Sequence, residues 1–91
     1  MLHADFRKNL IRIHLLYHGC NDEGLEPAVI TPEIKGHGYK TNEKEINEQL
    51  EHLHLEGYLI KTGDIYIITD EGKKEFSELK KRINELCKEI N

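Results

Sequence analysis

The chain has 91 residues, of which 37% are hydrophobic and 33% are charged. This length provides one small domain, with too little chain for a second core. The formal net charge of −4 differs from the basic charge of most free-standing nucleic-acid-binding modules, although binding depends on where the lysines cluster. Two cysteines are too few for a disulfide framework, and the polar residues in "MLHADFRKNLIRIHLLYHG" exclude a signal peptide or a membrane span. We therefore expect a cytoplasmic protein with reduced thiols.

A broad apolar stripe at helical spacing predicts a first helix over about residues 3–18. Because the stripe is broad, we expect this helix to pack on more than one side. Gly19 is its expected end, and "CNDEGLEP" is a predicted loop. The stripe consists of Phe6, Leu10, Ile13 and Tyr17, widened by Ile11, Leu15 and Leu16.

The second helix has two candidate starts. Thr31, Pro32 and Glu33 match an N-cap followed by proline at the first helical position, which predicts a short helix ending near Gly36. A start at Pro27 is the alternative, and Pro32 would then lie inside the helix and kink it.

The third helix is predicted over about residues 43–56. Asn42 can cap it, and Glu45 follows three residues later, as in a capping box. The spacing of its residues predicts an amphipathic helix. Its inner face consists of Ile46, Leu50, Leu53 and Gly57, and its outer face of Lys44, Glu48, Glu51 and His52.

Two β-rich runs, "YLIKT" and "IYIIT", are joined through Gly63 and Asp64 and predict a β-hairpin. A two-residue loop fixes the register of the two strands. The predicted pairs are Thr62 with Ile65, Ile60 with Ile67, and Leu59 with Ile68.

A last helix is predicted from the cap Thr69 to about Ile90, with Asp70 and Glu71 at its positive end. Its apolar residues recur at steps of three and four, which is a heptad seam. About 20 helical residues extend roughly 30 Å, which is longer than so small a domain covers. We therefore expect a homodimer interface that consists of Phe76, Leu79, Ile83, Leu86 and Ile90.

The order helix, helix, helix, hairpin, long helix predicts the α+β fold class: a winged helix-turn-helix with a short two-stranded wing and a long C-terminal dimerisation helix. We expect one domain over residues 1–91, with a winged-helix core over 1–69 and the dimerisation helix over 70–91.

Four motifs follow one another along the chain: "LLYH" (15–18), "HGY" (37–39), "LEHLHLEGYL" (50–59) and "YIITDEGKKEF" (66–76). In order and spacing they resemble the PadR family of transcriptional regulators, over about residues 10–85. The resemblance implies a DNA-binding homodimer that regulates transcription, typically as a repressor. Some members respond to small molecules, phenolic compounds among them, so the resemblance also implies a small-molecule effector, although no residue here identifies one.

The resemblance places the DNA contacts on the third helix and the wing. Asparagine can pair with adenine, and lysine can reach guanine or phosphate. Asn47 stands where the family has a tyrosine in its recognition helix, and the wing offers one lysine where the family wing is longer and basic. The expected contacts to double-stranded DNA are Lys40, Thr41, Asn42, Lys44, Asn47 and Lys61.

The glutamates of the third helix leave a second interpretation open. Glu43 could accept a hydrogen bond from cytosine, whereas DNA phosphates would repel Glu48 and Glu51. In this alternative the chain is a winged-helix protein-interaction module that does not bind DNA. Its acidic third helix would then meet a basic partner or mimic the charge of DNA.

Six histidines and two cysteines raise the question of a metal site. His14 and His18 are four residues apart and Cys20 follows, but this spacing is looser than that of a paired-ligand zinc motif. We therefore expect no metal. The chain contains no Gly-rich phosphate loop, no G-x-S-x-G and no H-E-x-x-H, so we expect no catalytic residues, no enzyme activity and no cofactor.

Overall fold

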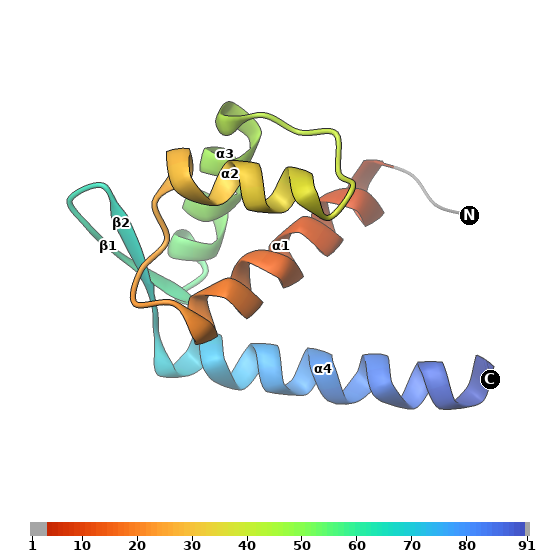
Figure 1. Cartoon of the computed structure of the whole chain (residues 1–91). Coiled ribbons are helices and arrows are strands. Elements are labelled where there is room, and N and C mark those ends of the chain that lie inside the picture. Colours follow the sequence, from red (N-terminus) through yellow and green to blue (C-terminus); the bar gives the residue numbers. More distant parts are fainter. Residues whose placement is uncertain (1–3, 91) are drawn as a thin grey trace.

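The computed structural model describes the backbone of residues 4–90 and the side chains of residues 6–89. Four helices and a two-stranded antiparallel sheet form an α+β fold with the layout of a winged helix, which confirms the predicted fold class. In Figure 1, α1 lies between the pair α2 and α3 on one side and α4 on the other. None of the described helices has the length and apolar character that crossing a membrane requires. The elements are α1 (Ala4–Asn21), α2 (Pro27–Gly36), α3 (Glu43–Leu55), β1 (Leu59–Thr62), β2 (Ile65–Ile68) and α4 (Asp70–Ile90).

The core lies where the first three helices meet the hairpin. On α1 the buried side chains are Ile11, Leu15 and Leu16, whereas Phe6 and Tyr17 are exposed. The three residues that widen the predicted stripe therefore form the face of α1 that packs on the core. Phe6 and Tyr17, at the two ends of the stripe, face outward. The rest of the core consists of Leu25, Ile30, Ile34, Ile46, Leu50, Leu53, Leu59 and Tyr66.

The prediction that α1 ends at Gly19 is wrong. The helix continues to Asn21, and Gly19 is buried inside it. A Cβ atom at Gly19 would lie 3.4 Å from the Cβ of Ile68, so the glycine allows β2 to approach the helix closely. The hydrogen bond from the Asp22 N–H to the His18 carbonyl, 2.8 Å long, continues the helical pattern past the glycine.

The preferred start of α2 at Thr31 is also wrong, and the alternative start at Pro27 is correct. Pro27 occupies the first helical turn, where its missing N–H is not needed. Pro32 lies inside the helix, and the Thr31 hydroxyl donates a 2.6 Å hydrogen bond to the Pro27 carbonyl. The longer helix buries both Ile30 and Ile34, which lie one turn apart.

Both ends of α3 follow from local chemistry. The side chain of Asn42 accepts a 2.9 Å hydrogen bond from the Glu45 N–H, which confirms the predicted cap. At the other end Gly57 has a φ of 88°, and the Tyr58 N–H donates to the Leu53 carbonyl at 2.9 Å. This is the Schellman arrangement, which favours glycine at the left-handed position.

The hairpin has the predicted register in all three pairs. A contact that the sequence did not predict extends it: the backbone of Leu25, in the loop after α1, exchanges hydrogen bonds of 2.7 and 2.9 Å with the backbone of Tyr66. The predicted cap of α4 is confirmed, because the Thr69 hydroxyl accepts a 3.0 Å hydrogen bond from the Gly72 N–H.

Candidate nucleic-acid interface

The first turn of α3 and the loop before it lie at the surface. The side chains of Lys40, Asn42, Lys44 and Asn47 are exposed, and Thr41 is half-buried. The Oδ1 atom of Asn42 already accepts the capping hydrogen bond. Its amide nitrogen is therefore the atom that remains to donate to an external group such as a phosphate.

Arg7 of α1 holds the acidic first turn of α3. Its guanidinium donates to both carboxylate oxygens of Glu45, at 2.9 and 2.7 Å, and to the Lys40 carbonyl at 3.1 Å. The Thr41 hydroxyl donates to the same carboxylate at 2.6 Å. The hydrogen bonds from Arg7 are the main cause that lowers the pKa of Glu45 to about 2. Glu45 is thus paired inside the domain, and Thr41 helps to position the loop.

A second arginine of α1 pairs with the middle and the end of α3. The Arg12 Nε donates a 2.7 Å hydrogen bond to the Gln49 side chain, and its Nη1 lies 3.7 Å from a carboxylate oxygen of Glu56. Sequence analysis missed both arginines as partners of α3, since they lie more than 30 residues away along the chain and no local spacing identifies them.

The wing contacts another glutamate of α3, Glu51. The buried Tyr66 donates a 2.6 Å hydrogen bond to Glu51, and this bond is the main cause that lowers the pKa of Glu51. Lys61 Nζ lies 3.8 Å from the same carboxylate and 5.5 Å from the centre of the Tyr66 ring. Burial raises the pKa of the Tyr66 hydroxyl, which therefore remains a donor at neutral pH.

Two of the predicted contacts come together at a surface hollow. Asn47 and Lys61 line a hollow of about 260 Å³ between α3, the wing and the start of α2, together with three carboxylates, those of Glu26, Glu43 and Asp64. Lys40 and Thr41 are not among its lining residues and lie beside the Arg7–Glu45 pair. The predicted contacts thus form two groups, one at the loop before α3 and one facing the wing.

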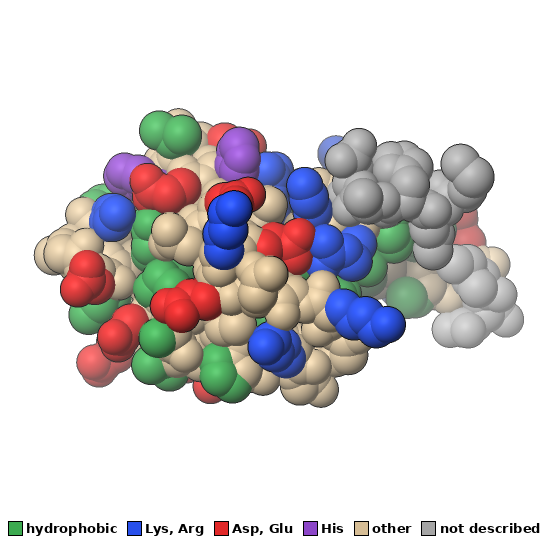
Figure 2. All heavy atoms as spheres, turned by 90° about the horizontal axis from the view of Figure 1, so that it is seen from above, with side chains coloured by type: hydrophobic (Ala, Val, Ile, Leu, Met, Phe, Trp, Pro, Cys, Tyr) green, Lys and Arg blue, Asp and Glu red, His purple; other side chains and the backbone are tan. Residues whose placement is uncertain are grey.

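The charges on this side of the molecule are mixed. In Figure 2 most of the basic side chains drawn in colour lie on the right half of this face and most of the acidic ones on the left, with acidic side chains also between the basic ones. Three of the five glutamates on or beside α3 pair with groups of the domain. Within the described part of the chain, Glu43 and Glu48 are exposed and have no ion-pair partner.

The predicted seam on α4 divides into two parts. Phe76 and Leu79 pack partly against the core of their own domain, whereas Ile83 and Leu86 are 39% and 55% exposed. Figure 1 shows that α4 diverges from α1 toward its C-terminal end. The side chain of Ile90 lies outside the described residues.

An apolar hollow of about 370 Å³ opens between α1 and α4. Its apolar lining includes Ile13 and Tyr17 of α1 and Phe76 and Ile83 of α4. The outer side chains of the α1 stripe therefore lie beside the α4 seam, and the two helices together present one apolar surface.

No protein-family model matches the chain. The chain is similar to a protein of Mycobacterium tuberculosis named transcriptional regulator Rv3488, with 24% identity over 94 aligned positions. The similarity extends over 94% of this chain and 87% of that protein.

Proposed function

We propose that the chain is a cytoplasmic, PadR-like winged-helix regulator that binds duplex DNA as a homodimer and represses transcription. The similarity to a protein named a transcriptional regulator, over almost the whole chain, supports the regulatory role. The winged-helix layout supports a docking mode in which the first turn of α3 enters the major groove. The wing then lies beside the DNA backbone.

The observation that carries the proposal is the pairing of the α3 glutamates inside the domain. Arg7 pairs with Glu45, and Tyr66 and Lys61 engage Glu51. These carboxylates therefore repel phosphates less than the sequence alone indicates, because a cation, Arg7 or Lys61, lies beside each of them. The exposed lysines at the start of α3 are then left to contact DNA.

The contacts that we propose have separate roles. Lys40 and Lys44 bind phosphates, and the amide nitrogen of Asn42 donates to another phosphate beside the helix start. Asn47 faces the groove and pairs with a base. Lys61 reaches the DNA backbone from the wing by leaving Glu51, to which Tyr66 still donates its 2.6 Å hydrogen bond.

A second copy of the chain is the proposed partner of the apolar surface formed by α1 and α4. Ile83 and Leu86 expose apolar area that a partner helix would remove from water. A two-fold axis would present both α3 helices to a pseudo-palindromic site about one helical turn apart.

Gel-shift titrations against the region upstream of the gene test DNA binding. Lys44→Ala and Lys40→Ala should weaken binding, and Asn47→Ala should relax preference at one base pair by roughly 1–3 kcal/mol. Glu48→Gln should strengthen binding to all sequences, because it removes repulsion from an unpaired, exposed carboxylate. Glu78→Gln on α4 has the same charge change and is the matched control.

The salt dependence gives an independent measure. Log affinity should fall with log salt concentration with a slope that reflects about three to six phosphate contacts per dimer. Absence of binding at low salt by the wild type and by Glu48→Gln would refute the proposal. Glu51→Gln is a poor probe, since Glu51 also accepts the hydrogen bond from Tyr66.

One observation favours the protein-interaction module as a second candidate. The outer face of the wing is apolar: Ile60, Ile65 and Ile67 are all exposed, where a DNA-binding wing would carry basic residues. Val29 and Ile65 also line a shallow hollow next to this face. Under this alternative DNA binding is negligible at every salt concentration, and Ile67→Ser weakens binding of a protein partner without affecting DNA.

A further inference from the structure

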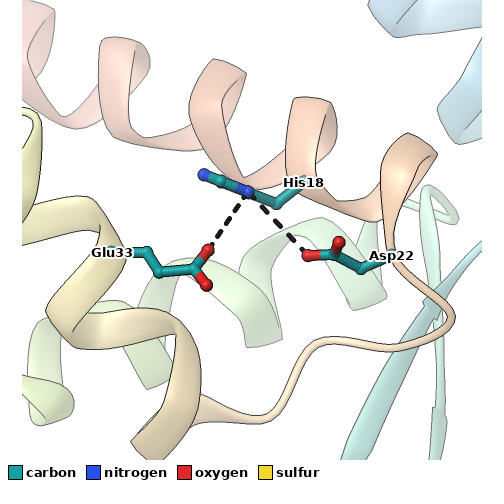
Figure 3. A group of neighbouring side chains, drawn as sticks. All are labelled: His18, Asp22 and Glu33. Atoms are coloured by element: carbon teal, nitrogen blue, oxygen red, sulfur yellow. Dashed lines mark ion pairs between the residues drawn. The ribbon is translucent and has the colours of Figure 1, made fainter.

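A histidine of α1, the carboxylate of Asp22 directly after α1 and a carboxylate of α2 converge at the end of α1 (Figure 3). His18 and Asp22 lie one helical turn apart, and Glu33 reaches them from α2. The Nδ1 atom of His18 lies 3.4 Å from a Glu33 oxygen and 3.9 Å from an Asp22 oxygen. One ligand atom from each of the three residues lies within 4.8 Å of the other two.

These separations are close to those around one metal ion. A tetrahedral ion with ligand bonds of about 2.0–2.1 Å holds its ligand atoms roughly 3.3–3.4 Å apart. The distance from His18 to Glu33 already has this value. The carboxylates of Asp22 and Glu33 are about half exposed, so small rotations can bring them to the remaining ligand positions.

The charges around the cluster also favour a cation. Within the described part of the chain, His18 is the ion-pair partner of both Asp22 and Glu33, and neither carboxylate pairs with a lysine or an arginine. The cluster lies at the C-terminal end of α1, where the helix dipole is negative. Two carboxylates and this dipole end leave a negative charge that a divalent ion would neutralise.

The ring of His18 is held in place before any ion binds. Its side chain is 14% exposed. Its ring packs edge-on against Tyr17, with 5.3 Å between ring centres, and lies tilted against His37 at 5.8 Å. A ligand that is already ordered loses little conformational entropy when it binds an ion.

We propose that His18, Asp22 and Glu33 bind a divalent transition-metal ion of the zinc class, with water completing the coordination. One imidazole and two carboxylates suit Zn²⁺ or Co²⁺, whereas Ca²⁺ requires six to eight oxygen ligands. This site differs from the set His14, His18 and Cys20 that the sequence spacing suggests, because its third ligand comes from α2.

The site holds an exchangeable ion and is not needed for folding. The Nε2 atom of His18 is buried and has no hydrogen-bond partner among the described groups. In strong metal sites this second ring nitrogen donates to an acceptor, and the loss of that support weakens affinity about 10–100-fold. The bound ion links the end of α1 to α2, which itself packs against α3.

Isothermal titration of the metal-free protein with ZnCl₂ tests the site directly. We expect one Zn²⁺ per chain and a rise in melting temperature on loading. Glu33→Gln and Asp22→Asn should each weaken Zn²⁺ binding about tenfold or more, since each removes a direct ligand. Both changes keep the size of a half-exposed side chain, so the variants should fold, and the melting temperature of each metal-free variant is the reference for its own rise on loading. Glu23→Gln, an exposed neighbour outside the cluster, is the matched control and should bind like the wild type.

Co²⁺ spectroscopy identifies the ligand atoms independently. Co²⁺ bound at this site should show visible bands without the near-ultraviolet charge-transfer band of a thiolate ligand, and Cys20→Ser should leave the spectrum unchanged. Two results would overturn the proposal: Zn²⁺ affinity that survives both Glu33→Gln and Asp22→Asn, or a thiolate band that Cys20→Ser removes.

Discussion

Glu45→Gln is the sharpest test of how α1 holds the start of α3. The substitution keeps the size of the side chain and removes the charge that pairs with both guanidinium nitrogens of Arg7. We expect the variant to fold and to be less stable than the wild type at pH 7, because Arg7 then lies beside a neutral amide.

The magnitude follows from the pKa of Glu45, which falls from 4.5 to about 2 in the folded protein. The difference between these two pKa values corresponds to an upper limit of about 3.4 kcal/mol, at about 1.36 kcal/mol for each pKa unit. The Arg7 side chain is 36% exposed, so solvent screens the pair, and we expect about 1–2 kcal/mol.

The pH dependence has a definite sign. The folded-state pKa of Glu45 is depressed, so its stabilising contribution is fully present above the unfolded pKa of about 4.5. It is lost as the pH falls through the folded value of about 2. The difference in unfolding free energy between the wild type and Glu45→Gln should therefore shrink steadily as the pH falls from about 5 toward 2.

Urea unfolding followed by far-ultraviolet circular dichroism, at fixed chain concentration, measures this difference at each pH. Glu43→Gln is the matched control. It removes the same charge from the same helical turn, and Glu43 has no ion-pair partner in the described part of the chain, so only the helix-dipole effect of about 0.3–1 kcal/mol is lost. If Glu45→Gln destabilises no more than Glu43→Gln, or by the same amount at pH 7 and pH 3, the Arg7 pair does not stabilise the fold as argued.

Three further changes probe the seam, the packing of α4 and the wing. Ile83→Asp should leave the chain monomeric in sedimentation velocity, because the proposed homodimer would have to bury its charge without a partner. A wild type that is itself monomeric at tens of micromolar, roughly the range of weak assembly, would contradict the proposed dimer. Gly72→Ala should destabilise the protein by about 1–3 kcal/mol in urea unfolding, because the added methyl group would collide with the Tyr58 carbonyl. Tyr66→Phe should raise the pKa of Glu51 toward its ordinary value, as measured by carboxylate ¹³C NMR titration. An unchanged pKa would show that the hydrogen bond from the Tyr66 hydroxyl does not lower the pKa of Glu51.

The sequence by itself determined the elements whose signals are local. The cap of α3 at Asn42 needs only a side chain three residues from the N–H that it accepts. The register of the hairpin follows from its two-residue loop, because a loop of that length fixes which residues of the two strands face each other, from Thr62 and Ile65 out to Leu59 and Ile68. The fold class follows from the order of these elements.

Where the sequence offers two possible boundaries for a helix, only the tertiary structure determines which one is adopted. Thr31 and Pro32 look like a helix start, yet α2 begins at Pro27. The reason is that the longer helix buries Ile30 as well as Ile34, and this burial outweighs the hydrogen bond that Pro32 cannot donate. Gly19 also looks like a helix end, because glycine is common at that position. In the structure it lies inside α1 and allows β2 to approach closely.

The charges and side-chain contacts of the candidate sites depend on residues that are distant in the sequence. Whether a glutamate of α3 repels DNA depends on Arg7, 38 residues before Glu45, and on Tyr66, 15 residues after Glu51. Glu33 likewise joins His18 and Asp22 only because α2 packs beside α1. Side-chain spacing along one helix predicts neighbours three or four residues apart, whereas only the packed fold brings charges from different helices within bonding distance.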